Sequence, residues 1–452
     1  MISYEQFTLI INYISKLPKK QFVCLPQKLE SDKIHTVMNK RAIIFFSIIL
    51  ILPLITFFVI KLARGYKPDL RNGKFKPTGL LVATSEPRGA QVLVNGHLTS
   101  ATNTTVSLSP GTYEVKIQKD GYIPWQKSLK IEKELVTETN AFLFPSVPNL
   151  QPLTYNGAQN PLLSPNGQRV AFVVPNASTK DKNGLYVLDF SPSPLTFNCD
   201  ARQILSSKTG LDLSDATYIW SPDSKQIFLK YKNQSFLLDV DRSVTLNQLT
   251  NISSNLNQIF DSWQKELDLE NQQKIKKLPE PLKKIIIDEA TNIQWSPDET
   301  KIMYTSQKNE TLPKVNINTY PSNFLQPEKR DIKANEVYVY NLKEDQNFYI
   351  MNNPEKPPEE AKESQDKNQM PNFLSSEPKA LSWFPTSRHL LLVQKDKVVI
   401  IEYDGTNNAV VFANSFENGF AYSSPDGSKI VILTSLNQEA NIPPNLYALS
   451  LK

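Results

Sequence analysis

The chain has 452 residues, 40% of them hydrophobic, which is enough for two or three domains with cores of their own. Its 50 basic and 45 acidic side chains leave a net charge of +5 spread along the chain, and this small excess predicts no nucleic-acid partner. Cys24 and Cys199 lie on either side of a long apolar segment, so they would occupy different compartments, and a disulfide framework is excluded.

Residues 1–41 form a polar, basic tail without a strong pattern. Met38 and the Asn-Lys-Arg after it lie immediately before the apolar segment and resemble a natural start. Two interpretations of residues 1–37 are therefore open: they belong to the native protein, or they are an over-extended gene model.

Residues 42–60 carry no charge over nineteen positions, a length that crosses a hydrocarbon core of about 30 Å as a helix. A buried core helix and a cleaved signal peptide are the alternatives. The apolar region of a signal peptide usually runs about 7–15 residues, which is shorter than this one. We therefore expect an uncleaved transmembrane helix over residues 42–62, followed by a linker over residues 63–75.

The charges beside this helix leave its orientation in the membrane open. The twenty residues before it hold four Lys and Arg and the twenty after it hold six, so the positive-inside rule taken literally points the C-terminal part into the cytoplasm. That rule applies poorly beside a large translocated domain. The expected location therefore depends on the identity of the domain next to the helix.

Residues 76–147 predict a small β-sandwich. Val92 and Val94 alternate before Asn95-Gly96, which is a hairpin turn signal, and apolar residues alternate again in the strands after this turn. The stretches Ser85-Glu-Pro-Arg-Gly-Ala-Gln-Val-Leu-Val-Asn-Gly and Leu108-Ser-Pro-Gly-Thr-Tyr-Glu-Val-Lys-Ile-Gln-Lys-Asp-Gly-Tyr-Ile-Pro-Trp resemble the PEGA domain. The signature tetrad of that family carries Arg88 here in place of its usual Glu.

The resemblance to the PEGA family implies a location and a kind of partner. The family is found mostly on prokaryotic cell surfaces and is similar to carbohydrate-binding and carboxypeptidase-regulatory sandwiches. This implied location outweighs the ambiguous charges beside the helix, so the C-terminal part is expected outside the cytoplasm.

From residue 150 onward a short turn motif recurs five times, each time followed by a β-branched or aromatic run. Proline presets φ, and Asn, Asp and Gly tolerate positive φ, so each copy predicts a hairpin that enters a buried strand. One such unit cannot bury its apolar faces alone, which predicts a propeller or a solenoid. The copies are Ser164-Pro-Asn-Gly, Ser221-Pro-Asp-Ser, Ser296-Pro-Asp-Glu, Phe384-Pro-Thr-Ser and Ser424-Pro-Asp-Gly.

Residues 150–452 resemble bacterial propellers of the TolB-like and WD-repeat-like type, whose blades carry a Trp-Ser-Pro-Asp-Gly signature. Trp220 and Trp295 match the opening of that signature best, whereas the copy at Phe384 departs from it. The fold class predicted for the chain is therefore mainly β: a PEGA-type β-sandwich and a β-propeller behind one N-terminal transmembrane helix.

The number of blades can be predicted from the spacing of the repeats. Three stretches interrupt them, and without these about 41 residues are left for each repeat, which fits five four-stranded blades, with room for a sixth inside an interruption. The strand expected at residues 150–155 has no repeat ahead of it, so we expect it to complete the last blade beside the strand at 445–451. The interruptions are residues 251–290, 306–334 and 351–379.

Two of these interruptions differ in kind. In residues 251–290 apolar residues fall at helical spacing, which predicts a helical insert whose apolar stripe packs against a blade or, alternatively, binds a partner. Residues 351–379 are charged and Pro-rich with few core formers, which predicts a disordered loop.

The sequence shows no catalytic, cofactor-binding or metal-binding constellation. Its three histidines, His35, His97 and His389, lie in separate segments, and it has neither a Gly-x-Ser-x-Gly elbow nor a Gly-rich phosphate loop. We therefore expect neither an enzyme nor a cofactor. The acids of the repeats are expected to bond their own turns rather than bind calcium or act as catalysts. These acids are Asp223, Asp298 and Asp426.

Aromatic residues supply the only candidate for a ligand-binding residue. The tryptophans before the turns are expected to pack between blades rather than to form a platform for sugars. Trp125, beside Pro124 in the sandwich, is the candidate, with a carbohydrate as its ligand. Cys199 is expected to be an inert thiol. The tryptophans before the turns are Trp220, Trp295 and Trp383.

Taken together, these features predict a single-pass, membrane-anchored, extracytoplasmic binding or scaffold protein of the cell envelope. Its sandwich and propeller would recognise a protein or a polysaccharide. Two alternatives are open: a propeller enzyme that acts on envelope glycans or peptides through carboxylates from different blades, and a cytoplasm-facing membrane sensor or assembly factor.

Overall fold

The computed structural model describes residues 40–63, 65–69, 74–190, 201–206, 213–315, 327–354, 379–414, 416–436 and 443–452. The chain divides into two units, Met1–Ala63 and Arg64–Lys452. The expectations for residues 1–37, His35, Cys24 and Cys199 concern positions outside the described residues.

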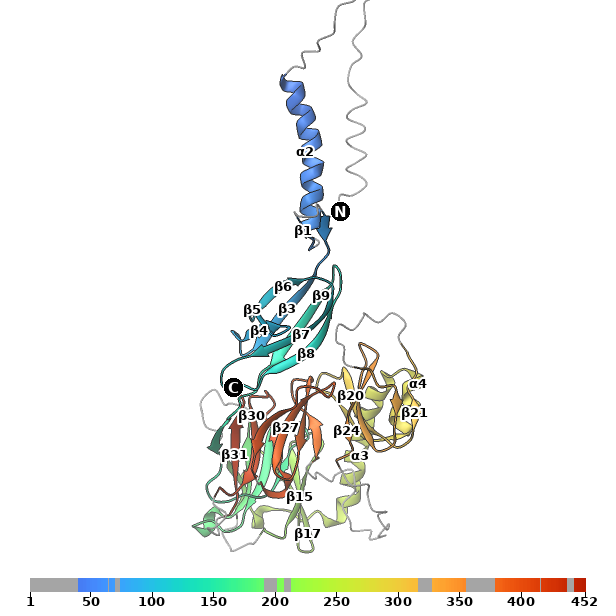
Figure 1. Cartoon of the computed structure of the whole chain (residues 1–452). Coiled ribbons are helices and arrows are strands. Elements are labelled where there is room, and N and C mark those ends of the chain that lie inside the picture. Colours follow the sequence, from blue (N-terminus) through green and yellow to red (C-terminus); the bar gives the residue numbers. More distant parts are fainter. Residues whose placement is uncertain are drawn as a thin grey trace, which may run out of the picture. The chain divides into compact units, whose positions relative to one another are not determined.

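The first unit contains the helix α2, Lys40–Ala63, which continues through Pro53 (Figure 1). Its apolar part, Ile44–Ala63, is 20 residues long and none of it is buried. The hydroxyl groups of Ser47 and Thr56 donate to backbone carbonyls of their own helix, at 2.9 and 2.8 Å, so these polar groups are satisfied without water. The predicted apolar helix is confirmed, and a helix of this kind can serve as a membrane anchor or as a signal sequence.

The second unit begins with a short hairpin and a sandwich of two sheets. In the smaller sheet β3 pairs antiparallel with β6 and parallel with β9. In the larger sheet the order is β5-β4-β7-β8, all antiparallel. The hairpin is β1 (Lys67–Asp69) and β2 (Lys74–Lys76), and the sandwich strands are β3 (Gly79–Glu86), β4 (Gln91–Val94), β5 (His97–Ala101), β6 (Thr104–Leu108), β7 (Gly111–Gln118), β8 (Trp125–Ile131) and β9 (Val136–Phe142).

One hydrophobic core lies between the two sandwich sheets. Alternation in the strands puts every second residue into it, as the burial of Leu81 and Ala83 on β3 and of Val115 and Ile117 on β7 shows. The predicted β-sandwich is confirmed.

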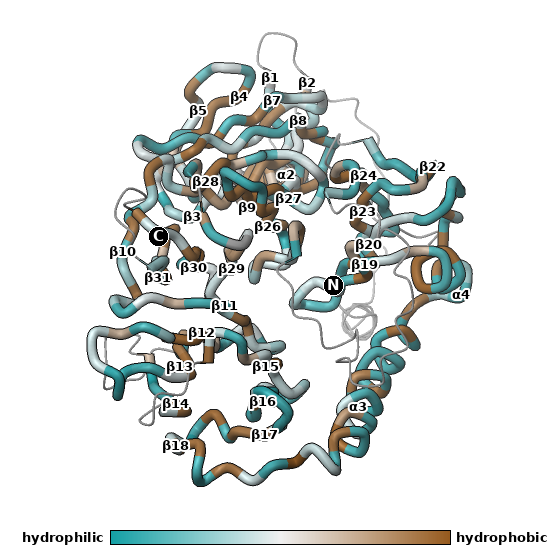
Figure 2. Tube along the Cα trace, turned by 90° about the horizontal axis from the view of Figure 1, so that it is seen from below, coloured by the Kyte–Doolittle hydropathy of each residue, from teal (hydrophilic) through white to brown (hydrophobic). Residues whose placement is uncertain are grey.

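Apart from the two-stranded sheet of β21 and β22, the remaining strands form five small sheets that succeed one another around a ring. In Figure 2 the strands β11, β15, β19 and β29 surround the centre of this ring. The blades are β11 (Gln159–Leu163), β12 (Arg169–Val174), β13 (Gly184–Asp189) and β14 (Arg202–Ser206); β15 (Thr217–Trp220), β16 (Gln226–Tyr231) and β17 (Gln234–Asp239); β19 (Ala290–Trp295), β20 (Lys301–Ser306), β23 (Glu336–Asn341) and β24 (Gln346–Asn352); β25 (Leu381–Trp383), β26 (His389–Val393), β27 (Lys397–Glu402) and β28 (Ala409–Ala413); and β29 (Ala421–Ser423), β30 (Lys429–Thr434) and β31 (Asn445–Ser450) with β10 (Asn149–Pro152).

The strand β10 closes the ring. It pairs antiparallel with β31, with Asn149 opposite Ser450 and Pro152 opposite Tyr447. The first strand of the propeller therefore completes the last blade, as its position in the sequence predicted. This pairing covers the edge of β31, which would otherwise be open to other chains.

The five repeated turns share one backbone geometry. In each, the amide of the fourth residue donates to the carbonyl of the first, at 2.8–3.0 Å. The fourth residue has a left-handed φ of between 54° and 71° in every copy, including the non-glycine residues Ser224, Glu299 and Ser387. The third residue accepts the backbone amide two positions on, so the acids of the repeats are turn residues, as expected.

Polar contacts join neighbouring blades at these same turns. The indole nitrogens of Trp220 and Trp383 each donate to a carbonyl of the preceding blade, at 3.0 Å, so both tryptophans pack between blades as predicted. The hydroxyl of Ser224 accepts the backbone amide of Asn166 at 3.1 Å, and Ser387 accepts that of Asp298 at 3.0 Å. These hydrogen bonds therefore connect the turns of the first and second blades and those of the third and fourth blades.

Replacing Ser224 with alanine is expected to lower the free energy of unfolding by about 1–2 kcal/mol, because the amide of Asn166 loses its partner in a site where Ser224 is 2% exposed. Denaturant unfolding measures the change. Ser254→Ala removes an exposed hydroxyl and serves as the control, with a change within about 0.5 kcal/mol. Equal effects of the two substitutions would show that the contact between turns does not stabilise the ring.

The predicted helical insert consists of α3 (Leu256–Lys276), α4 (Glu280–Leu282) and a π-helical turn at Lys283–Asp288. The first half of α3 packs Trp263, which is buried, against Ile219 and Phe228 of the second blade. The predicted stripe therefore contacts a blade. A correction concerns the loop predicted to be disordered over residues 351–379: its first two residues belong to the strand β24, because they continue the ladder with β23, and residues 355–378 lie outside the described residues.

The short elements complete the described structure. β18 (Val244–Thr245) pairs parallel with β14, and β21 (Glu310–Thr311) pairs with β22 (Asp331–Ile332) inside the third blade's interruption. Single 3₁₀ turns lie at Lys180–Lys182, Leu246–Gln248, Ser253–Asn255 and Glu417–Gly419.

Candidate functional site

A buried ion cluster joins the sandwich to the propeller. Lys127 on β8 forms ion pairs with Glu402 at the end of β27 and with Asp404 in the adjoining turn, the latter at 2.6 Å. The three side chains are 9%, 6% and 3% exposed. Burial by itself lowers the pKa of Lys127, but the two neighbouring carboxylates outweigh it and raise that pKa above its ordinary value.

Hydrogen bonds hold the two carboxylates of this cluster in place. The backbone amide and the hydroxyl of Thr406 both donate to Asp404 Oδ1, at 3.1 and 2.6 Å. The indole nitrogen of Trp125 donates to Glu402 Oε1 at 2.5 Å. One backbone bond adds to this joint, from the amide of Gln126 to Asn407 Oδ1 at 2.9 Å. Side chains of the two domains therefore share one satisfied polar network.

Aromatic rings extend the contact beside the ion cluster. Phe142 and Phe144 of the sandwich end meet Phe384 and His389 of the fourth blade, with ring centroids between 5.4 and 6.1 Å apart across the joint. Burial lowers the pKa of His389 to about 3, with a contribution from the positive charge of Arg388, so this imidazole is neutral at ordinary pH. His389 is therefore a packing residue of the joint.

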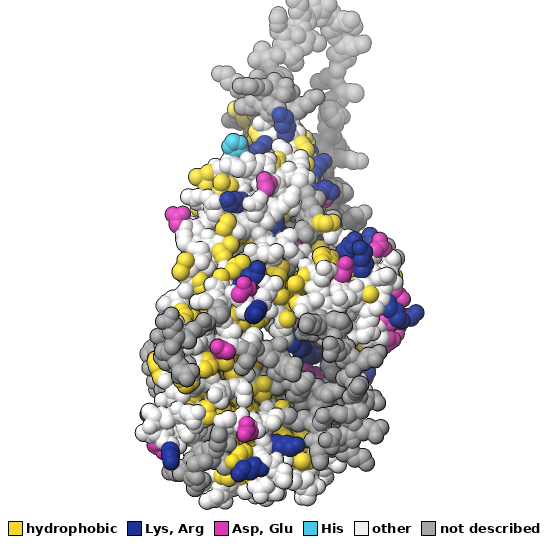
Figure 3. Space-filling model, turned by 60° about the horizontal axis from the view of Figure 1, so that its bottom comes forward, with side chains coloured by type: hydrophobic (Ala, Val, Ile, Leu, Met, Phe, Trp, Pro, Cys, Tyr) yellow, Lys and Arg dark blue, Asp and Glu magenta, His cyan; other side chains and the backbone are white. Residues whose placement is uncertain are grey.

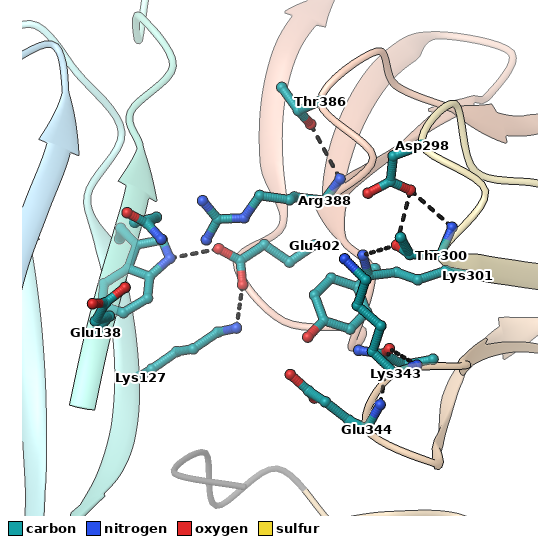
Figure 4. Close-up of a pocket in the computed structure, with 14 residues that line it drawn as sticks. Lys127, Glu138, Asp298, Thr300, Lys301, Lys343, Glu344, Thr386, Arg388 and Glu402 are labelled. Carbon is teal, nitrogen blue, oxygen red and sulfur yellow. Dashed lines mark hydrogen bonds and ion pairs between the residues drawn. The ribbon is translucent and has the colours of Figure 1, made fainter. Parts of the chain in front are cut away.

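Two neighbouring cavities lie between the sandwich and the propeller, and we call them together the groove. The first has a volume of about 350 Å³ and is drawn in Figure 4. It is lined by Trp125, Lys127, Glu138, Asn140, Asp298, Thr300, Lys301, Asn341, Lys343, Glu344, Thr386, Arg388, Glu402 and Tyr403.

The second cavity has a volume of about 610 Å³ and shares Asn140, Thr386 and Arg388 with the first. Both volumes fall within the range of small-ligand sites. Strands of the sandwich form one wall of the second cavity, and the fourth and fifth blades form the other. It is lined by Thr84, Ser85, Glu86, Arg88, Asn103, Asn140, Ala141, Phe142, Thr386, Arg388, His389, Asp426 and Lys452.

Several charges of the groove are already engaged. Glu402 pairs with Lys127, and Glu86 pairs with Lys452 at 3.3 Å. Burial alone would raise the pKa of Asp298, but hydrogen bonds from Ser296 and Thr300 outweigh it and lower that pKa. The same balance, with Ser424 and Ser428 as donors, lowers the pKa of Asp426. All four acids are therefore committed to partners.

Several charged side chains of the groove are less fully engaged, among them Lys301, Glu344 and Arg388. Lys301 lies 4.8 Å from the centre of the Tyr403 ring, and burial lowers its pKa. Burial raises the pKa of Glu344, whose Oε2 has no hydrogen-bond partner among the described residues. The guanidinium group of Arg388 pairs with no carboxylate in the described part of the chain. The groove therefore holds open hydrogen-bonding capacity beside its satisfied network.

Carboxylates from two blades meet in the first cavity, a feature that the enzyme alternative required. Asp298 and Glu344 come from the third blade and Glu402 from the fourth. Asp298 and Glu402 are held by turn and joint contacts, which leaves Glu344 as the uncommitted acid of these three. Among the described residues no group of three or more His, Cys, Asp and Glu side chains could hold a metal ion. The arrangement supports the binding of polar groups more directly than acid–base chemistry.

The structure places Trp125, the predicted ligand residue, at the edge of the first cavity. Its side chain is 3% exposed and packs in the sandwich core, and its indole nitrogen is occupied by Glu402. Its ring therefore offers no open face to a sugar here, and its assignment as a ligand residue stays a prediction.

Sequence reasoning missed Lys127, Glu402 and Arg388. A usable signal existed for the first of them: Lys127 stands on the same face of β8 as the buried Trp125 and Leu129. A lysine at an inward position of a strand is rarely buried unless it is paired, so the pattern requires an acidic partner elsewhere. No comparable signal marks Arg388.

The charges on the outer surface are distributed differently from those in the groove. The face shown in Figure 3 mixes acidic and basic side chains, and among the residues drawn there in colour no broad patch of one sign appears.

Residues 78–146 match the family model described as the PEGA domain. Among solved structures, a putative TolB from Agrobacterium tumefaciens is 12% identical with a TM-score of 0.20, covering 67% of this chain and 78% of that one. TolB from Acinetobacter baumannii is 14% identical with a TM-score of 0.20, covering 75% of this chain and 59% of that one. Dipeptidyl peptidase 4 from Porphyromonas gingivalis is 9% identical with a TM-score of 0.18, covering 71% of this chain and 42% of that one.

These TM-scores are too low to establish a shared fold by themselves, so the propeller rests on the strand pairing of its five sheets. No curated protein matches the chain. The PEGA match covers the sandwich with its two sheets, and the recognition of that domain from its motifs is thereby confirmed.

Proposed function

We propose that this chain is a membrane-anchored, extracytoplasmic binding protein of the cell envelope, with α2 as its single-pass anchor and the groove as its binding site for a protein or a polysaccharide. The observation that supports this most is the joint: Lys127, Glu402 and Asp404 lock the sandwich to the propeller beside two polar cavities that both domains line. A rigid cleft between two domains is a common place for a binding site.

Two further features support the envelope location. Ile44–Ala63 is long and apolar enough to cross a membrane, and its side chains are exposed in the first unit. The adjoining sandwich matches the PEGA domain, a family whose resemblance implies the prokaryotic cell surface. Membrane anchoring would hold the groove near envelope polymers and so raise the effective concentration of these polymers at the binding site.

Labelling of single cysteines in intact cells tests the orientation. In a chain without its native cysteines, Val147→Cys places a thiol at a site that is 87% exposed, and Asn39→Cys places one before the helix. We expect a membrane-impermeant maleimide to label Val147→Cys in intact cells and Asn39→Cys only after lysis. The reverse pattern would favour the cytoplasm-facing alternative, because the large unit would then lie inside.

A further inference from the structure

We infer that the groove binds an acidic glycan, a hydroxyl-rich chain whose carboxylate or phosphate group contacts the guanidinium group of Arg388. This inference rests on the proposed binding role and names its ligand class, but it does not depend on the orientation in the membrane. The inference depends on Arg388, which lines both cavities and has no acidic partner among the described residues.

The backbone of Arg388 is fixed while its side chain is available. Its amide donates to Thr386 Oγ1 at 3.3 Å, and its carbonyl accepts the amide of Tyr403 at 2.9 Å. In Figure 4 the guanidinium group extends from the propeller toward the sandwich wall of the cavity. A preorganised guanidinium fork matches the two oxygens of a carboxylate or phosphate group, so a ligand anion gains two charge-assisted hydrogen bonds.

The sandwich wall supplies further donors. Asn103 Oδ1 accepts the backbone amide of Ser85 at 3.1 Å, and the Asn140 amide lies 2.7 Å from the hydroxyl of Thr84, which also donates to the carbonyl of Thr139. Because a backbone amide holds the Asn103 oxygen, the Asn103 NH₂ group is left as a donor at the second cavity, where it has no partner among the described residues. Arg88, which is exposed at the same cavity, adds another group that can only donate.

At the second cavity these donors favour a ligand rich in acceptor oxygens. Hydroxyl groups of Thr84, Ser85 and Thr386 complete a lining in which apolar side chains are few. Sugar hydroxyls pair with amides and hydroxyls in this way, whereas a peptide would gain most of its affinity from apolar pockets or an open strand edge. Two adjoining cavities suit at least two sugar units, and the anionic group belongs where the cavities meet, at Arg388.

The test is a calorimetric titration of the full chain in detergent micelles with four probes. They are trigalacturonate, phosphorylated maltotriose, neutral maltotriose and hexaglutamate, which separate carboxylate sugar, phosphate sugar, uncharged sugar and acidic peptide. We expect one or both acidic sugars to bind at least about tenfold more tightly than maltotriose and hexaglutamate. The acidic sugars combine hydroxyl groups with an anion that forms charge-assisted hydrogen bonds with Arg388.

Arg388→Gln is expected to weaken binding of the acidic sugar at least about tenfold, and Arg388→Lys to restore only part of it, because a lysine keeps the charge without the fork. The matched control is Arg242→Gln, which removes the same charge from a side chain that is 79% exposed outside the groove, and it should leave affinity unchanged. The thermal midpoint of Arg388→Gln should equal that of the unsubstituted protein, which separates lost binding from lost folding.

Equal affinity for maltotriose, a preference for hexaglutamate, no binding of either acidic sugar, or unchanged binding by Arg388→Gln would each overturn the inference. Tight binding of maltotriose or hexaglutamate would leave the binding role of the groove in place and replace only its ligand class. Failure of the envelope location would appear separately, in the cysteine labelling.

Discussion

Replacing Lys127 with methionine is expected to lower the free energy of unfolding by about 3–5 kcal/mol. The substitution removes the cation between Glu402 and Asp404, and two carboxylates that are only 6% and 3% exposed then face each other without a counter-charge. Breaking a buried ion pair costs far more than breaking a surface pair, because the remaining charges cannot reach water. Denaturant unfolding of the full chain in micelles measures the loss.

Two further variants make this result specific. Lys130→Met removes a lysine whose side chain is 52% exposed in its pair with Glu132, and a loss of no more than about 1 kcal/mol is expected. The triple variant Lys127→Met, Glu402→Gln, Asp404→Asn removes all three charges together and should recover most of the lost stability. A Lys127→Met protein as stable as Lys130→Met would show that the cluster does not hold the joint.

The pH dependence of the same residue has a definite sign. The pKa of Lys127 is raised in the folded protein, so its contribution is complete below the unfolded value of about 10.4 and is lost as the pH rises through the folded value. Above the unfolded pKa of about 10.4, the free energy of unfolding of the unsubstituted protein should therefore fall more steeply with pH than that of Lys127→Met.

A disulfide between positions 152 and 447 is expected to raise the free energy of unfolding by up to about 5 kcal/mol, because it closes a loop that contains nearly the whole propeller. Pro152 and Tyr447 are opposite each other in the pairing of β10 with β31. Leu446 accepts the amide of Leu153, while the amide of Leu451 donates to Ser428, so the backbone of Tyr447 faces away from β10. The pair is therefore a non-hydrogen-bonded one, with the short Cα separation that a disulfide tolerates.

The experiment uses Pro152→Cys with Tyr447→Cys in a chain without its native cysteines. Oxidised and reduced forms of this one protein are compared by denaturant unfolding, so the cost of the substitutions themselves cancels. A cross-link that does not form under oxidising conditions, or one that leaves stability unchanged, would mean that β10 does not close the ring.

Both predictions concern the rigidity on which the groove depends. Ring closure fixes the blades relative to one another, and the ion cluster fixes the sandwich against the fourth blade. Arg388 on the propeller and Asn140 on the sandwich can hold one ligand only if that distance is constant, since a loosely held donor has to be ordered at the moment of binding. The contact between the sandwich and the fourth blade thus forms the groove and also holds its two walls at a constant distance.

Local chemistry along the chain was enough to determine several parts of this protein. The apolar run at α2, the five turns and the hairpin at Asn95 depend on residues within a few positions of each other, whose φ preferences and periodicity can be interpreted directly. The closing strand was also predictable, because a strand without a repeat of its own is left over when the blades are counted. Trp220, Trp383 and the acids of the turns were assigned correctly for the same reason: equivalent positions in a repeat have similar surroundings.

Only the tertiary structure decided which side chains meet at the joint. Lys127 and Asp404 are 277 positions apart, and Arg388 gains its role from a sandwich wall that lies far away in the sequence. The inward position of Lys127 indicated that an acidic partner was required, but any of 45 acidic residues could have supplied it. Which acid does so is determined by how two separately folded β domains dock, and docking depends on the shape and burial of whole surfaces rather than on patterns along one strand.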